Sequence, residues 1–150
     1  MAFLGKYFLR FFIYCVVLTM IFGVLAALLP NAIAPILTAF PFLIAMILVL
    51  YHFLKTEKRA PTRPERNKIA IGFVAIFFIY NIIFALLGPL IFNWKVENVV
   101  SIWLNFITHK QFLLQLITQL MMYMIPLYII TFWFYGLQSQ RMAKKMFSSE

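Results

Sequence analysis

The stretch FFIYCVVLTMIFGVLAALLPNAIAPILTAFPFLIAMILVLYHFL, residues 11–54, contains no Asp, Glu, Lys or Arg. It is more than twice as long as the roughly 20 residues that one helix needs to cross a hydrocarbon core. Pro30, Asn31 and Pro35 fall near its middle, and proline both removes a backbone donor and clashes with the preceding helical turn. We therefore predict a tight reversal there, between two membrane-spanning helices at about 8–29 and 35–54.

Two more uncharged runs follow, at residues 69–94 and 111–140. They predict a third and a fourth spanning helix at about 66–92 and 112–136. The chain is 65% hydrophobic and 11% charged, whereas soluble domains carry about 25% charged residues. The sequence therefore predicts an all-α integral membrane protein, in which residues 1–150 form a single domain of four transmembrane helices.

The positive charges predict the orientation of these helices. Of the 13 Lys and Arg residues, only Lys95 and Lys110 lie between the third and fourth helices. The others lie in the N-terminal segment, in the loop between the second and third helices, and in the C-terminal tail. Four spans place these three segments on one side of the membrane, and the positive-inside rule makes that side the cytoplasm. We expect both termini to be cytoplasmic.

The net charge of +9 would suggest nucleic acid as the partner of a soluble protein. Here the basic residues flank apolar spans, so we expect anionic lipid headgroups as partners, and no nucleic acid. An acidic protein partner for the central loop remains an alternative. The residues assigned to headgroup contact and topology are Lys55, Lys58, Arg59, Arg63, Arg66, Lys68, Arg141, Lys144 and Lys145.

The N-terminus has a second interpretation. Lys6 and Arg10, the apolar stretch after them and the sequence Ala32-Ile33-Ala34 together resemble a cleavable secretory signal. The apolar stretch, however, is about 19 residues long, whereas a signal core has about 7–15. A proline-rich turn into another hydrophobic helix explains the small residues equally well.

Two polar segments carry local helix signals. Thr62 followed by Glu65 matches a capping box, so the third helix should begin near Arg63. Between the third and fourth spans, apolar residues recur at helical spacing over about 96–108. This pattern predicts a short amphipathic helix in the outer interface, with Trp94 and Trp103 as anchors, although a partner could dock on the same surface.

The polar side chains inside the spans are neutral. Tyr80 and Asn81 lie in the third helix, and Gln115, Thr118 and Gln119 share one face of the fourth. In lipid such groups seek hydrogen bonds across helix interfaces. We expect them to form interhelical contacts within the bundle or between protomers. The alternative is a polar cleft for a small neutral or amphiphilic ligand.

Two prolines, Pro41 and Pro126, fall inside the second and fourth predicted helices, where proline can kink a helix. Kinks of this kind are common in membrane helices and free backbone carbonyls. They are compatible with either reading of the polar residues.

The sequence offers little for catalysis, and we expect no enzyme, no cofactor and no metal. His52 and His109 are predicted at opposite membrane faces, and Cys15 is the single cysteine. No CxxC, HExxH, GxSxG or glycine-rich phosphate loop occurs in the chain. Apart from Arg10, Arg66 and Lys68 at their cytoplasmic ends, the predicted spans carry no acidic or basic residue, which argues against a proton-coupled pump such as the small multidrug exporters.

Several short motifs resemble a family of small, uncharacterised four-span inner-membrane proteins of Gram-negative bacteria. The resemblance covers the chain from about residue 35. It implies a bacterial inner membrane and four spans, and it carries over no functional residue. The motifs are Pro41–Met46 (PFLIAM), Arg59–Thr62 (RAPT) with Glu65-Arg66, Gly72-Phe73, Tyr80-Asn81, Phe134–Gly136 (FYG) and Gln140–Ala143 (QRMA).

The expected function is therefore a non-catalytic one. The leading hypothesis is an accessory or structural membrane protein that acts through contacts with itself or with a membrane-protein partner. The alternative is a small transporter, or a protein that binds a lipid or neutral solute through the polar residues of the third and fourth helices.

Overall fold

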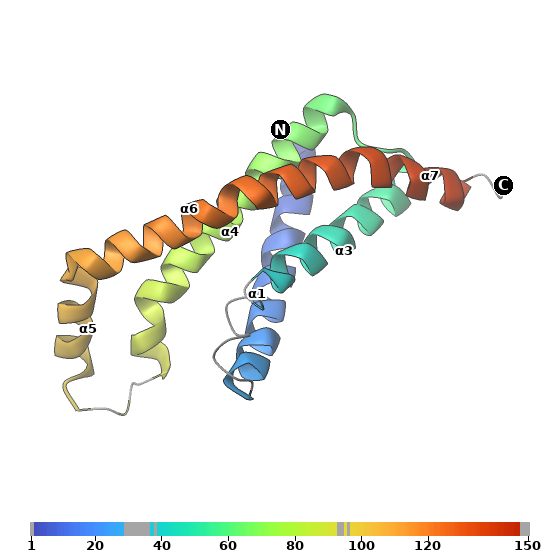
Figure 1. The fold of residues 1–150 in the computed structure, drawn as a ribbon. Helices are drawn as coiled ribbons and strands as arrows, with labels where there is room; N and C mark the ends of the chain where they lie inside the picture. The colour runs from blue at the N-terminus through green and yellow to red at the C-terminus, as the bar shows by residue number, and fades with distance from the viewer. Residues whose placement is uncertain (1, 29–36, 38, 93–94, 96, 148–150) are drawn as a thin grey trace. The chain divides into compact units, whose positions relative to one another are not determined.

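The computed structural model describes residues 2–28, 37, 39–92, 95 and 97–147. Within these ranges the regular structure is helical (Figure 1), in the order α1 (Ala2–Leu28), α3 (Phe40–Glu57), α4 (Arg63–Phe92), α5 (Val99–Thr108), α6 (Lys110–Trp133), the π-helix η1 (Phe134–Gln138) and α7 (Ser139–Phe147). Among the described residues, four helices are long and apolar enough to cross a membrane. The prediction of an all-α chain with four such helices is confirmed.

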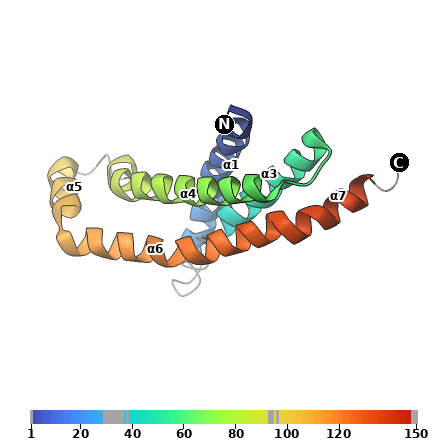
Figure 2. The same ribbon diagram turned by 90° about the horizontal axis from the view of Figure 1, so that it is seen from above.

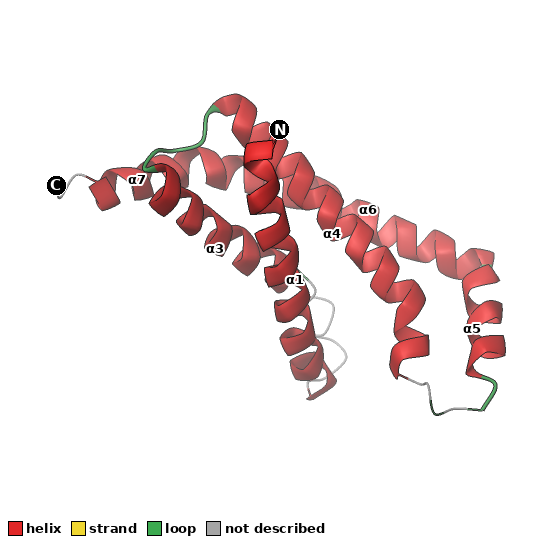
Figure 3. Cartoon of the chain, turned by 180° about the vertical axis from the view of Figure 1, so that it is seen from behind, coloured by secondary structure: helices red, strands yellow, loops and turns green. Residues whose placement is uncertain are grey.

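Helix boundaries follow local chemistry at the two ends of the loop between α3 and α4 (Figure 3). Lys58 ends α3 in the left-handed conformation, with φ of 50°, and its N–H donates to the carbonyl of Leu54. The carboxylate of Glu65 accepts a hydrogen bond of 2.8 Å from the backbone N–H of Thr62. α4 accordingly begins at Arg63, as the capping-box pattern predicts.

The two prolines inside predicted helices have different positions. α3 begins at Phe40, so Pro41 occupies its first turn rather than its interior. A proline there loses no intrahelical hydrogen bond, and no kink is expected from it. Pro126 does lie inside α6. The predicted reversal at Pro30–Pro35 lies outside the described residues.

Contacts divide the chain into two compact units. The first comprises residues 1–77 and 127–150, and the second comprises residues 78–126. In the first unit α1 packs against α3 (Figures 1 and 2), while η1 and α7 continue the line of α6 without a break in the helix (Figure 2). The single domain expected from the sequence stays a prediction.

Aromatic rings form the core of the first unit. Phe11 of α1 and Phe73 of α4 stack with ring centroids 3.8 Å apart and planes inclined by 4°. Phe42 of α3 packs edge-on against both Phe11 and Phe77, at 5.3 and 5.4 Å. Such pairs contribute about 0.5–1.5 kcal/mol each beyond the area they bury. These rings therefore join α1, α3 and α4 side chain to side chain.

Side-chain contacts join the helices of the second unit; one of them is the ring pair of Phe106 on α5 and Phe112 on α6, with centroids 3.9 Å apart. The indole N–H of Trp103 on α5 donates to the backbone carbonyl of Leu86 on α4, at 2.5 Å. α5 spans Val99–Thr108, so the predicted helix at about 96–108 exists. Its place in the outer membrane interface stays a prediction.

Candidate functional site

The polar residues predicted inside the spans differ in exposure. Tyr80 is 3% exposed on α4, and Asn81 beside it is half-buried. Gln115, Thr118 and Gln119 are all exposed on α6. All five belong to the second unit. Whether they line a cleft or hold helices together stays a prediction.

The exposed polar residues of α6 belong to a longer exposed face. Met122, which is 73% exposed, and Pro126 follow them at helical spacing and are exposed as well. We call this face the α6 stripe; its members are Gln115, Thr118, Gln119, Met122 and Pro126. At 1.5 Å per residue, Gln119 lies about 13 Å along the axis from Lys110, well within a span of about 30 Å. The stripe therefore places two amides within the apolar length of α6.

The basic residues assigned to the lipid surface are exposed, with one exception. Arg66 of α4 is half-buried, and its guanidinium lies 5.1 Å from the ring centre of Phe132. Its terminal nitrogen also lies so close to Gly136 that a Cβ at that position would collide with it. Gly136 belongs to η1, so the missing side chain makes room for the arginine.

The first turns of α4 contact the C-terminal part of α6 through Arg66 and through its neighbour Asn67. The amide oxygen of Asn67 accepts a hydrogen bond of 2.7 Å from the hydroxyl of Tyr128. Arg66 also borders a recess of about 350 Å³ shared with Tyr128, Phe132 and Trp133. Aromatic faces beside a guanidinium provide cation–π contact, which strengthens where water is excluded. The start of α4 is thereby fixed against the end of α6.

Two ion pairs lie near the loop between α3 and α4 in the first unit. The ammonium of Lys6 lies 3.1 Å from Glu57 Oε1, which also accepts a 2.6 Å hydrogen bond from the hydroxyl of Tyr7. Arg59 donates two hydrogen bonds of 2.8 Å to the carboxylate of Glu65. These bonds raise the pKa of Arg59 above its ordinary value, so its guanidinium stays charged. Glu57 was not predicted from the sequence, although a single acidic residue beside several basic ones is a signal that the sequence does contain.

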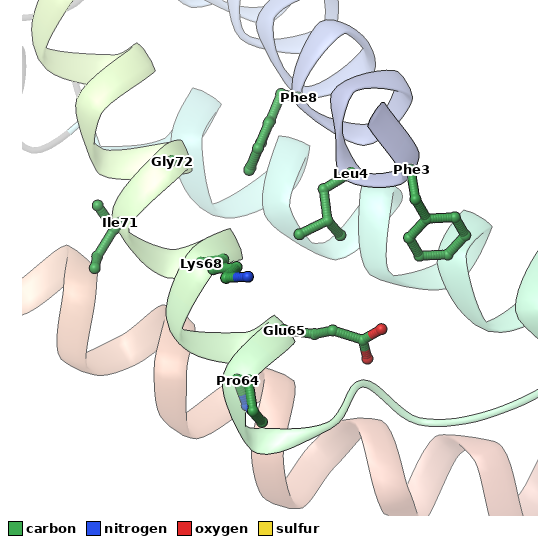
Figure 4. A pocket seen from close by; sticks show the side chains of 8 residues that line it. All are labelled: Phe3, Leu4, Phe8, Pro64, Glu65, Lys68, Ile71 and Gly72. Carbon is green, nitrogen blue, oxygen red and sulfur yellow. The ribbon is translucent and has the colours of Figure 1, made fainter. Parts of the chain in front are cut away.

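A groove of about 430 Å³ lies between the first turns of α1 and α4 (Figure 4). Leu4 and Phe8 point from α1 toward α4, and the side chain of Lys68 reaches from α4 into the space between the two helices (Figure 4). A Cβ at Gly72 would collide with the ring of Phe8, so this glycine allows the ring to lie against α4. The full lining comprises Phe3, Leu4, Phe8, Pro64, Glu65, Lys68, Ile71 and Gly72.

Residues that could ligate a metal do not cluster in the described part of the chain. Among those residues, no three His, Cys, Asp or Glu side chains lie close enough to hold a metal ion. Cys15 is a free, buried thiol. Three surface features are described above: the exposed α6 stripe, the recess beside Arg66 and the groove beside Lys68, called the Lys68 groove from here on.

Comparison with known protein families, characterised proteins and solved structures found no match for this chain. The resemblance to a family of small inner-membrane proteins therefore stays a prediction.

Proposed function

We propose that this chain is a non-catalytic protein of a bacterial inner membrane, with both termini in the cytoplasm, that acts through lateral contacts between helices. On this proposal it is an accessory or structural protein, and its partner is a second copy or another membrane protein. The observation that carries the proposal is the exposure of Gln115, Thr118 and Gln119 on one face of α6.

Lipid makes that exposure costly. An amide in hydrocarbon has no water to bond, and an unsatisfied polar group there costs several kcal/mol. Gln115 and Gln119 are separated by four residues, so their side chains lie one above the other on the same face. A second helix carrying hydrogen-bonding groups relieves both at once. Each such bond across a membrane interface contributes about 0.6–2 kcal/mol.

The proposed orientation and compartment are supported by the charges. The loop between α3 and α4, the first two turns of α4 and the segment α7 carry basic residues, which are exposed apart from Arg66 of α4. Exposed Lys and Arg at span ends favour the cytoplasmic face, where anionic lipid attracts them. α5, with its apolar residues at helical spacing, fits the opposite interface.

The test combines the α6 stripe with a matched control. The variant Gln115→Leu with Gln119→Leu removes both amides, and Gln140→Leu makes the same chemical change at an exposed glutamine of α7. The full-length protein is extracted in mild detergent and studied by native mass spectrometry. We expect a defined oligomer, or a stoichiometric membrane-protein partner, whose association weakens at least about 10-fold in the double variant and persists in Gln140→Leu.

A different result would favour the alternative function. A wild-type monomer that retains one specific neutral molecule, and loses it on Asn81→Leu, would contradict the accessory role. It would support a small transporter or a solute-binding protein that uses Tyr80 and Asn81. An oligomer unchanged in the double variant would show that the α6 stripe is not the contact face.

A further inference from the structure

We infer that the Lys68 groove binds one phospholipid molecule, with the lipid phosphate on the ammonium of Lys68 and an acyl chain along the apolar wall formed by α1 and α4. This site is independent of the α6 stripe, because it lies in the other unit. It differs from general attraction between basic residues and anionic lipid in being a defined recess.

The charges that line the groove suit an anionic ligand. Its lining contains one carboxylate, Glu65, and one ammonium, Lys68. The carboxylate is already engaged by the guanidinium of Arg59 and by the N–H of Thr62. Within the described part of the chain, no carboxylate lies within ion-pair distance of Lys68. The charge left to recruit a ligand is therefore positive, which suits a phosphate.

Along α4, the charged side chain of the groove is followed by apolar ones, as the phosphate of a phospholipid is followed by its acyl chains. Lys68 is the last charged residue before the uncharged run that begins at Ile69. Ile71 and Gly72 follow it by three and four residues, which places them about one turn, or 5 Å, deeper along the helix. A phospholipid has the same order, since its phosphate lies directly above its acyl chains. A charged peptide does not reproduce this gradient along a membrane normal.

The groove is open at its flanks and closed at its back. Ile71 is 54% exposed and Phe3 is 40% exposed, whereas Leu4 at the back of the groove is 8% exposed. The groove thus has a closed apolar back and open flanks, through which a lipid can enter from the bilayer. Its volume of about 430 Å³ falls within the range of about 300–1,000 Å³ typical of ligand sites.

The experiment measures retained lipid in the full-length protein. The protein is purified in mild detergent, mixed with dioleoyl-phosphatidylglycerol and analysed by native mass spectrometry. Lys68→Gln removes the ammonium, and Leu4→Trp fills the groove while leaving every charge in place. Lys58→Gln is the matched control, because Lys58 is also exposed and lies outside the groove.

We expect one tightly retained lipid in the wild type and in Lys58→Gln, and at least a 5-fold lower bound fraction in Lys68→Gln and in Leu4→Trp. Inorganic phosphate at 100-fold excess over the lipid should not displace it, since the acyl chain supplies part of the binding. Equal loss in Lys58→Gln and Lys68→Gln would overturn the proposal in favour of unspecific charge attraction. Undiminished binding in both groove variants would also overturn it, as would displacement by phosphate alone.

Discussion

Tyr135 shows how one side chain can anchor the first unit. It is fully buried, its ring packs edge-on against Phe73 at 5.8 Å, and its hydroxyl donates a 2.9 Å hydrogen bond to the carbonyl of Met46. Burial of a tyrosine is favourable only when its hydroxyl finds such a partner. The residue therefore joins η1 to both α3 and α4.

The variant Tyr135→Phe should lower the stability of the folded protein by about 1 kcal/mol. The substitution keeps the ring and removes one buried hydrogen bond, whose usual net contribution is about 0.5–1.5 kcal/mol. Thermal denaturation of the purified protein in mild detergent measures the effect. Tyr51→Phe is the control, because Tyr51 is 50% exposed. Equal destabilisation by both variants would contradict the role assigned to Tyr135.

Single residues were the hardest part to predict from the sequence. Hydropathy identifies Tyr135 and Arg66 as members of a span or its edge, but it does not say which residues they meet. Their contacts depend on the rotation of each helix about its own axis. In this chain nearly every face of every span is apolar, so periodicity does not specify that rotation.

At the scale of elements, the start of α4 is the feature with the clearest local cause. Thr62 and Glu65 have the spacing of a capping box. The backbone N–H of Thr62 donates a hydrogen bond to the carboxylate of Glu65, and α4 begins between them, at Arg63. Glu65 adds a second interaction through Arg59. One side chain therefore caps a helix and closes a loop.

Two substitutions at Glu65 separate these roles. Glu65→Gln keeps an acceptor for the N–H of Thr62 and loses the ionic contact with Arg59, whereas Glu65→Ala loses both. An exposed ion pair contributes about 0–1 kcal/mol, and loss of a cap costs about 0.5–2 kcal/mol. We expect faster amide hydrogen exchange in the first turn of α4 for Glu65→Ala, and a much smaller change for Glu65→Gln. Equal acceleration in both variants would mean that the ion pair dominates.

Elements differ in how well their sequence predicts them. The start of α4 and the existence of α5 follow from patterns within a few residues. The start of α3 at Phe40 does not, since nothing in the apolar run distinguishes a proline in the first turn from a proline in mid-helix. The π-helix at Phe134–Gln138 has no sequence signal either. A π turn differs from an α turn only in holding about one more residue, and that difference does not show in the residue types.

At the scale of the whole molecule, the positions of the charged residues along the chain predict most of the architecture. It predicts four spans and an orientation, and the structure confirms four apolar helices of sufficient length. The candidate surfaces were only partly predictable. The α6 stripe follows from spacing within one helix, whereas the Lys68 groove requires α1 and α4 to come together from residues far apart in the chain.

The orientation can be tested with two conservative cysteine substitutions in a Cys15→Ala background. Ser101→Cys lies on α5, and Thr56→Cys lies near the end of α3; both positions are exposed. If the termini are cytoplasmic, a membrane-impermeant maleimide should label Ser101→Cys in intact spheroplasts and Thr56→Cys only after lysis. The reverse pattern would contradict the proposed orientation.

The π-helix has a consequence for the C-terminal tail. An α-helix advances by about 100° per residue, and the wider turn at Phe134–Gln138 joins α6 to α7. A π turn takes up one residue more than an α turn, so a residue can be gained or lost there without rotating the helix that follows. Deleting one residue from this turn would therefore return the chain to regular α-helical winding, with Arg141, Lys144 and Lys145 pointing in nearly the same direction. A deletion elsewhere in α6 would instead rotate the positive charges of the tail by roughly 100° about the helix axis, so this turn shields the direction of the tail from changes of length within it.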